Sequence, residues 1–433
     1  MFALPGIGRR ESFIHKRDIG GKDPMRFLLK SITGVAIFVA MSSAAQADPL
    51  RVAVIESLSG PQASTGRPYL IAAHYVLDAL NAQGGFNGEK IVVTEYNSGG
   101  KPAGASEKFQ QAATDGVHVV IQGSSSAIAA QLSDDIRQYN LSNPGKEVLY
   151  LNVGAEALEL TGEKCHFHSF RFTTTAPMRV SALVKVMKDE GALGKRVYSI
   201  NQNYSWGKDM EMAIKANAER GGYETVEAVL HDVTRIQDFS PYVTKIQAAS
   251  PDTVLTGNWS NDLLLLMKAV GDAGLKTRFG TTFLDQVGNI SNAGEQALGH
   301  YVAHPYNIEL TDGTFAKDYK KATGHLPVYV EPNAVNALKV FTSALTSVNA
   351  GGGPINTNQI ALALESASYQ TEIGAMTIRK EDHQAFMPVV VSRVAKDVKY
   401  PVDGTDMGFK PVKVVASEDV MYPVQDSCKM QRP

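Results

Sequence analysis

The chain has little cysteine, little tryptophan and little net charge. It holds two cysteines and two tryptophans, and 42 Lys and Arg against 44 Asp and Glu leave a formal net charge of −2. No run of like charge occurs, so the composition offers no electrostatic reason to bind nucleic acid or an anionic membrane. Phosphate-loop and dinucleotide-binding glycine patterns are missing, as is the G-x-S-x-G turn of many hydrolases. The 433 residues exceed one ordinary core and predict two domains.

Long hydrophobic runs are also missing, and the one short run lies near the N-terminus. Met25–Ala47 has a basic start, an apolar run over Ile32–Met41 and an Ala-Gln-Ala end. These features predict a secretory signal cleaved after Ala47, with residues 1–24 upstream of the true start. A membrane anchor is the alternative, but the run is short for a spanning helix. Loss of residues 1–47, with seven basic and three acidic side chains, would change the net charge to −6.

The two cysteines, Cys165 and Cys428, both follow this signal. In an oxidising compartment such a pair is plausibly a disulfide, which would connect the C-terminal tail to the middle of the chain. Two unpaired buried thiols are the alternative. The disulfide is favoured because Cys428 lies in a polar tail with few buried positions.

From residue 50 to about 300, short apolar segments alternate with helical patterns. We predict strands at residues 51–55, 90–95, 117–122, 147–152, 196–201, 224–231, 253–256 and 278–282. This alternation predicts an α/β fold with doubly wound parallel sheets, in two series that separate near residues 172–177. From Phe315 the pattern becomes helical, and strand-like segments follow at 375–379 and 386–394. The last 30 residues are expected to be irregular.

Ligands of open parallel sheets bind beyond the carboxyl ends of the strands, so the loops there are candidate sites. After one predicted strand comes Gly123, followed by Ser124, Ser125 and Ser126 at the start of a helix. Hydroxyls and free N–H groups at a helix start suit an anion such as a carboxylate. A simple helix cap is the alternative. A nucleophilic serine is disfavoured because no motif places a histidine beside it.

Other strand-end loops carry polar or aromatic side chains. One holds Ala155 and Glu156, and the chain's two tryptophans occupy the loops with Tyr204 and Trp206 and with Asn258 and Trp259. Aromatic walls there would bury an apolar ligand body, although packing between loop and helix is the alternative.

Two further groups of polar residues are candidate sites. Asp285, after another strand, could pair with a ligand ammonium or cap a turn. Cys165, His166 and His168 resemble a metal cluster, but a fourth ligand at suitable spacing is missing, so we expect neither a metal nor a cofactor.

Several segments, in this order and spacing, resemble the periplasmic leucine/isoleucine/valine-binding proteins of ABC transporters, which have the type I periplasmic binding fold. The resemblance covers about residues 50 to 400 and rests on SLSGP at Ser57–Pro61, LNAQGGFNG at Leu80–Gly88, SSS at Ser124–Ser126, NYSWG at Asn203–Gly207, the run Asp238–Asp262 and AVGDAGLKT at Ala269–Thr277.

The resemblance implies roles for individual residues. Ser124 matches the serine that binds the ligand α-carboxylate, and the backbone of Ala155 helps to hold the ligand. Trp206 and either Asn258 or Trp259 match aromatic positions of the second lobe, and Asp285 matches the acid that binds the α-ammonium. Residues around 63–66 also contribute in the family.

Two residues depart from the family pattern. Glu156 stands where the family usually has a small polar residue, and a buried carboxylate there would repel a ligand carboxylate. Trp206 replaces a tyrosine. Both departures leave open a ligand such as an amide, an amine or an aromatic acid.

The resemblance also implies a hinge of three chain crossings, near Phe172, His304 and Thr377. Lobe 1 would then comprise 48–172 and 304–376, and lobe 2 would comprise 173–303 and 377–433. The expected function is that of a periplasmic solute receptor, not an enzyme, which closes on a small molecule and docks on ABC permease subunits. A sensing subunit of the same fold is the alternative, and a periplasmic hydrolase is less favoured. No membrane insertion is expected after signal cleavage.

Overall fold

The computed structural model describes residues 48–348 and 354–433. The predicted signal segment, within residues 1–47, lies outside the described residues. None of the helices in the described ranges combines the length and the apolar composition that crossing a bilayer requires.

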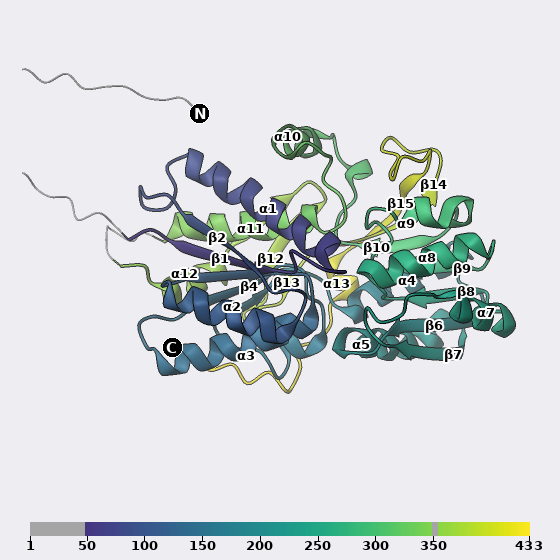
Figure 1. Ribbon diagram of the computed structural model, residues 1–433, viewed down its shortest axis with the longest axis horizontal. Helices are drawn as coiled ribbons and strands as arrows, with labels where there is room; N and C mark the ends of the chain where they lie inside the picture. Colours follow the sequence, from purple (N-terminus) through teal and green to yellow (C-terminus); the bar gives the residue numbers. More distant parts are fainter. Residues whose placement is uncertain (1–47, 349–353) are drawn as a thin grey trace, which may run out of the picture. The chain divides into compact units, whose positions relative to one another are not determined.

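The first sheet has five parallel strands in the order β2-β1-β3-β4-β5, of which β1, β2 and β4 are labelled in Figure 1. Its strands are β1 Arg51–Glu56, β2 Val92–Asn97, β3 Val119–Gln122, β4 Leu149–Asn152 and β5 Ser169–Arg171. Every residue of β3 and β4 is buried, as expected for parallel strands covered on both faces. The accompanying helices are α1 Ala63–Ala82, α2 Pro102–Thr114, α3 Ser126–Ser142 and the 3₁₀ turn η1 Leu158–Thr161.

The second sheet has seven strands in the order β15-β14-β10-β9-β8-β6-β7. Five are parallel: β6 Arg196–Gln202, β7 Glu224–His231, β8 Thr253–Thr256, β9 Arg278–Thr281 and β10 Tyr301–His304. The antiparallel pair β14 Val389–Ala395 and β15 Gly408–Val415 completes it beside β10. Its helical elements are α4 Ala176–Asp189, α5 Ser205–Ala216, α6 Ala218–Gly221, α7 Ser240–Ala249, α8 Ser260–Asp272, α9 Asn289–Ala293 and η2 Gly294–Ala297.

The remaining elements join the two sheets. They are η3 Ile308–Leu310, α10 Thr314–Thr323, α11 Glu331–Ser347, α12 Thr357–Leu364, the small antiparallel sheet β11 Ser368–Thr371, β12 Gly374–Ile378 and β13 Ala385–Phe386, and α13 Ser417–Val420. Helix α11 packs on α1 and on β11, so α10, α11, α12 and the small sheet belong with the first sheet, whereas η3 packs on β15 and α13 packs on α4 of the second sheet. We call the first sheet with these neighbours lobe 1, and the second sheet with its helices lobe 2. The fold is therefore α/β with parallel, doubly wound sheets, as predicted.

The structure differs from the expected chain crossing near Thr377. Thr377 pairs with Ser368 and with Phe386 inside the small sheet, and Gln384 bridges Arg171 at the edge of lobe 1. Residues 377–386 complete the small sheet first. After leaving lobe 2 at the end of β10, the chain therefore returns to lobe 2 only at β14.

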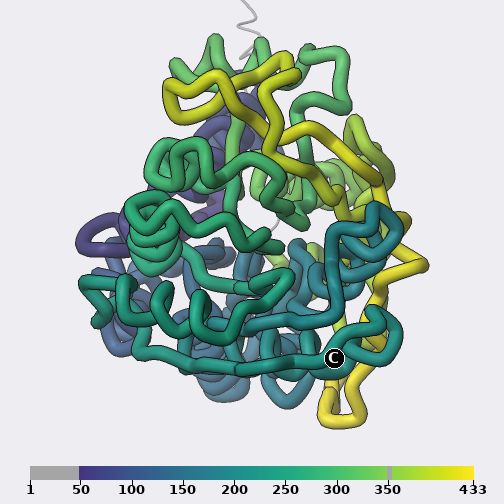
Figure 2. The backbone as a smooth tube through the Cα atoms, turned by 90° about the vertical axis from the view of Figure 1, so that its right-hand side faces the viewer, coloured from purple at the N-terminus to yellow at the C-terminus, as the bar shows by residue number. Residues whose placement is uncertain are grey.

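The C-terminal tail also differs from the prediction, because it is not wholly irregular. β15 pairs with β14, and α13 packs on α4 of lobe 2. The chain then returns to lobe 1, where the Gln425 side-chain amide donates to the Leu158 carbonyl at 2.7 Å. Figure 2 shows this yellow segment running along one edge of the view. The tail pairs because Gly408–Val415 includes Phe409 and three valines, which suit a strand beside β14.

Cys165 and Cys428 form the predicted disulfide, 263 residues apart in sequence. We expect Cys165→Ser/Cys428→Ser to lower the free energy of unfolding by about 2–4 kcal/mol, because the crosslink restricts the unfolded chain. Urea unfolding of the two proteins measures this difference. Ser427→Ala, at an exposed neighbour of Cys428, is the control and should change stability by less than about 0.5 kcal/mol. Labelling of two reactive thiols in the native folded protein would contradict the pairing.

Candidate functional site

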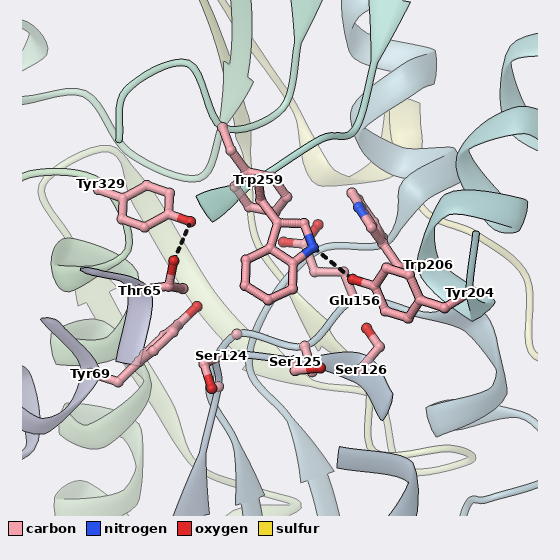
Figure 3. A pocket seen from close by; sticks show the side chains of 14 residues that line it. Thr65, Tyr69, Ser124, Ser125, Ser126, Glu156, Tyr204, Trp206, Trp259 and Tyr329 are labelled. Carbon is pink, nitrogen blue, oxygen red and sulfur yellow. Dashed lines mark hydrogen bonds between the residues drawn. The ribbon is translucent and has the colours of Figure 1, made fainter. Parts of the chain in front are cut away.

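A narrow cavity lies where loops of the two lobes meet, with a volume of about 20 Å³. Lobe 1 supplies Thr65, Tyr69, Gly123, Ser124, Ser125, Ser126, Gly154, Ala155, Glu156 and Tyr329, and lobe 2 supplies Tyr204, Trp206, Trp259 and Phe283. The loops after β3, β4, β6, β8 and β9 all contribute, so the cavity lies at the carboxyl ends of parallel strands. Figure 3 shows the serine loop facing the two tryptophans across it.

The lobes are joined by the Glu156–Arg179 pair described below and by further hydrogen bonds, among them the following two. The Leu158 N–H donates to Asp209 Oδ2 at 2.7 Å, and the Ser260 hydroxyl donates to the Pro61 carbonyl at 3.0 Å. Burial raises the pKa of Asp209 to about 6, although the bond from Leu158 acts in the opposite direction. The lobes are thus connected through α5 and through the start of α8 of lobe 2.

The serine loop is built around Tyr69 of α1. A Cβ on Gly123 would lie 2.6 Å from the Tyr69 ring, and one on Gly154 would lie 1.8 Å from the Tyr69 hydroxyl. Only glycine leaves room for this tyrosine between the two strand-end loops. The ring therefore forms a wall of the cavity that the sequence analysis did not include.

Ser124 and Ser125, which the sequence predicts to bind a ligand, line the cavity. Ser124 Oγ lies 3.2 Å from Ser57 Oγ, and the Ser125 side chain makes no capping bond to α3 although Ser125 is the N-cap residue. When the Gln122 amide oxygen faces the loop, it accepts from the Ser124 N–H at 3.0 Å and the Ser125 N–H at 3.1 Å. The serine hydroxyls, more than these N–H groups, are then the donors available to a solute.

Glu56 lies beneath the serine loop and is fully buried. Its Oε1 accepts from the Gly123 N–H at 2.6 Å. Burial raises the pKa of Glu56 to about 8, against the smaller opposing effect of hydrogen bonds from Ser124 and from backbone N–H groups. A carboxyl group with this pKa is mainly protonated at neutral pH, so it places no full negative charge beneath Ser124.

Glu156 is paired with Arg179, and both side chains are almost entirely buried. Glu156 Oε1 accepts from Arg179 Nε at 3.1 Å and from the hydroxyls of Thr173 and Thr174 at 2.8 and 2.9 Å. Arg179 Nη1 also donates to the Ala303 carbonyl at 2.9 Å. The sequence predicts that Glu156 repels an anionic ligand, but the positive charge of Arg179 compensates the Glu156 carboxylate. Arg179 lies 23 residues further along the chain, and no local pattern indicates that the two side chains pair.

The tryptophans form the lobe 2 wall and also take part in the packing. Trp206 donates from Nε1 to the Gly257 carbonyl at 2.8 Å, and its ring centroid lies 5.6 Å from that of Phe283. Trp259 donates from Nε1 to the Tyr204 hydroxyl at 2.7 Å (Figure 3). Both indole N–H groups are thus satisfied within lobe 2, and the rings present mainly apolar surface to the cavity.

Asn258 and Asp285 lie outside the lining of this cavity. Asn258 is fully buried, and its Oδ1 lies 3.1 Å from His231 Nε2. Asp285 borders a second small cavity together with Thr173, Arg179 and Tyr329, and its Oδ2 lies 3.0 Å from His304 Nδ1. Asn258 therefore acts as a support of the loop, whereas Asp285 adjoins the site.

Besides Tyr69, three lining residues have weak or no signals in the sequence. Thr65 lies in the first loop, which the resemblance had indicated around residues 63–66. Phe283 precedes Asp285 in a strand-end loop whose clearest signal in the sequence is the charge of Asp285. Tyr329 lies in the turn before α11, where its hydroxyl lies 3.5 Å from Thr65 Oγ1, and only the folded chain brings it there.

The candidate metal ligands are used elsewhere. Cys165 is in the disulfide, His168 Nε2 lies 2.6 Å from Asn358 Oδ1, and burial lowers the pKa of His166 to about 3. Within residues 48–348 and 354–433, no group of three or more His, Cys, Asp and Glu side chains could hold a metal ion.

Comparisons with known proteins agree with this architecture. Residues 49–399 match the family model described as periplasmic binding protein. The chain is 54% identical over 410 residues to the Leu/Ile/Val-binding protein homolog 4 of Brucella abortus (strain 2308), covering 94% of this chain and 99% of the relative. The Leu/Ile/Val-binding protein of Escherichia coli (strain K12) is 25% identical over 366 residues, covering 80% of this chain and 91% of the relative.

A solved structure is similar over most of the chain. It is the closed conformation of the leucine-, isoleucine-, valine-, threonine- and alanine-binding protein from Brucella ovis, with a TM-score of 0.84 and 56% identity, covering 89% of this chain and all of that one. A solute-binding protein of Rhodopseudomonas palustris in complex with benzoate shares the fold, with a TM-score of 0.72 and 18% identity, covering 86% of this chain and 99% of that one. With this extent of similarity, the chain belongs to the periplasmic binding protein family.

Proposed function

We propose that the mature chain is the exported solute-binding receptor of an ABC importer and that it captures a small amino acid in the cavity between its lobes. The observation that carries the proposal is a cavity walled by strand-end loops of both sheets, with serine hydroxyls on one side and indole rings on the other. A polar donor loop suits a carboxylate, and aromatic walls suit an apolar side chain. The names of the relatives at 54% and 56% identity support this solute class.

In this proposal, solute enters with the lobes apart and closure buries it. The hydrogen bonds Leu158–Asp209 and Ser260–Pro61 then stabilise the closed state, which docks on a membrane permease. The predicted signal cleavage after Ala47 would release the receptor into the periplasm. An aromatic acid is the second candidate solute, because structures of this fold occur in complex with benzoates.

Thermal unfolding of the mature protein tests the solute class. L-Leucine, L-isoleucine, L-valine, L-threonine, L-alanine and 4-hydroxybenzoate would be added separately. A solute present at 100 times its Kd should stabilise the folded state by about 2.7 kcal/mol. Stabilisation by 4-hydroxybenzoate alone would favour the second candidate, and stabilisation by none of the six would overturn the proposed solute class.

Ser124→Ala tests the carboxylate contact. A hydrogen bond to a charged group contributes about 1.5–3 kcal/mol, so we expect the Kd for the stabilising amino acid to rise by about 10–100-fold. Isothermal titration calorimetry measures this change. Ser142→Ala, at the exposed end of the same helix α3, is the matched control and should leave the Kd unchanged. An unchanged Kd for Ser124→Ala would show that the carboxylate does not bind there.

A further inference from the structure

Residues 421–433, which we call the C-terminal strap, run from lobe 2 onto lobe 1. The strap starts at α13, which packs on α4 of lobe 2, and the Met421 N–H still donates to the Ser417 carbonyl of α13 at 2.9 Å. The next residue is already bonded to lobe 1, because the Tyr422 carbonyl accepts from Arg379 Nη1 at 2.9 Å. Consecutive Cα atoms are about 3.8 Å apart, so the strap changes lobes with almost no free chain.

The strap adds a connection to those of the hinge. Within residues 48–348 and 354–433, the chain passes between the lobes after β5, after β10 and after β13, and it passes once more after α13. The sequence predicts three such crossings, so the strap is a further one. Figure 2 shows its course in yellow.

A hydrogen bond and a disulfide fasten the middle of the strap to lobe 1. The Gln425 side-chain amide donates to the Leu158 carbonyl at 2.7 Å. Cys428 is bonded to Cys165, which follows η1 in the sequence. The disulfide keeps the strap on lobe 1 when the hydrogen bond of Gln425 breaks. This hydrogen bond then re-forms readily, because a linked partner has a high effective concentration.

The surface of lobe 1 leaves room for the strap. A Cβ on Gly162 would lie 2.9 Å from Gln425 Oε1 and 2.9 Å from Ser427 Oγ, so the lack of a side chain at Gly162 admits both groups. Beyond the disulfide, Arg432 pairs with Glu365, whose side chain is 7% exposed. The strap is therefore tied down along its length, unlike the termini of most domains.

One residue of lobe 1 contacts both the strap and lobe 2. The Leu158 carbonyl accepts from Gln425, and the Leu158 N–H donates to Asp209 Oδ2 of α5 at 2.7 Å. Arg171 fixes the same turn, because its Nη1 donates to the Ala157 carbonyl at 2.5 Å. The strap is thus attached beside a contact between the lobes, where a separation of the lobes would pull on it.

We propose that the C-terminal strap limits how far the lobes separate in the absence of solute and thereby raises the affinity for solute. The inference rests on the proposed function, in which the lobes open and close. Opening moves α13 away from Arg379 and Leu158, so it stops where the strap is taut unless the bonds of the strap to lobe 1 break. A receptor with restricted opening loses less conformational freedom on closure, so solute binding costs less free energy.

A longer strap tests this role while every contact of the strap is retained. Gly-Ser-Gly-Ser-Gly-Ser inserted between Met421 and Tyr422 adds up to about 20 Å of free chain. Small-angle X-ray scattering of the mature protein should show a larger radius of gyration without L-leucine, but not with saturating L-leucine. Calorimetry should show a Kd for L-leucine that is about threefold higher or more, because the apparent Kd varies inversely with the binding-competent fraction.

The same insertion between Gly145 and Lys146, in the exposed loop after α3, is the matched control. It adds equal mass but no freedom between the lobes. Its effect on the radius of gyration should be the same with and without L-leucine, and the Kd should not change. A second variant, Cys165→Ser/Cys428→Ser, should behave like the longer strap at a temperature where it is folded. If it does not fold, the two insertions decide.

Two results would overturn the inference. The first is a longer strap that matches the loop control in its radius of gyration without L-leucine and in its Kd. The second is a change in the cysteine variant that the longer strap does not share, because the disulfide would then act only by stabilising lobe 1.

Failure of the inference is distinguishable from failure of the proposed function. If the unmodified protein and the longer strap bind L-leucine equally, the strap has no such role while the receptor function stands. If no solute in the thermal screen stabilises the protein, the receptor proposal itself is contradicted. Scattering of the two insertion variants without solute still compares how far their lobes separate.

Discussion

Arg179→Met is expected to lower the free energy of unfolding by about 3–5 kcal/mol, because it leaves the buried Glu156 carboxylate without its cation. Arg179 is 3% exposed and bonds Glu156, Thr174 and the carbonyls of Thr282 and Ala303. Its loss therefore removes donors from the segments that join β5 to α4 and from the ends of β9 and β10. Urea unfolding of the mature protein measures the difference.

A second variant separates the charge from the packing. Arg179→Met/Glu156→Leu removes both charges, and paired removal is often close to neutral, so it should recover most of the lost stability. Recovery should be incomplete because the Thr282 and Ala303 carbonyls still lack a donor. Lys185→Met, on the exposed face of the same helix α4, is the control and should cost less than about 1 kcal/mol. A cost below 1 kcal/mol for Arg179→Met would show that Glu156 is not charged in the folded state.

Glu56→Gln is expected to remove a pH dependence of stability that the unmodified protein shows between about pH 4.5 and 8. Burial raises the pKa of Glu56 from 4.5 to about 8, so the folded chain retains a proton that the unfolded chain has released in this range. The free energy of unfolding then falls as the pH rises. The contribution is fully present below about pH 4.5 and is lost by about pH 8. One pKa unit corresponds to about 1.4 kcal/mol, so the free energy of unfolding should fall by about 3–5 kcal/mol over this range.

Glutamine cannot ionise but retains an oxygen that accepts from the Gly123 N–H. Urea unfolding at pH 5, 7 and 8.5 should therefore give a decline for the unmodified protein that is absent or much reduced in the variant. Other carboxyl groups, such as Asp209, are present in both proteins. Their effect therefore cancels when the free energies of unfolding of the two proteins are subtracted. Glu107→Gln, at an exposed carboxylate of α2, should retain the full decline. Parallel curves for Glu56→Gln and the unmodified protein would show that Glu56 ionises normally.

The role of Glu56 links stability to the site. In the proposed function, a neutral carboxyl beneath Ser124 would let the serine hydroxyls face a ligand carboxylate without a negative charge on Glu56. The same group would become repulsive once ionised.

Local patterns in the sequence were sufficient for the architecture and for part of the site. The alternation of short apolar strands with helices determined parallel sheets because strands covered on both faces need apolar residues throughout, as in β3 and β4. The carboxyl-end rule then located the loops of Ser124, Glu156, Trp206 and Trp259, which line one cavity. Cys165 and Cys428 could be paired because the chain offers only one combination.

Tertiary structure alone decided which side chains complete the site and which charges compensate one another. Tyr329 reaches the cavity from 174 residues beyond Ala155, Arg179 meets Glu156 at the segment joining the lobes, and Asn258 turns to His231 instead of the cavity. Burial depends on all the segments that cover a group, so the raised pKa of Glu56 has no signal in the residues around it. Strand and helix patterns depend on neighbours in sequence, whereas compensation of charge depends on neighbours in space, and for this reason the sequence determined the frame and the folded chain determined its electrostatics.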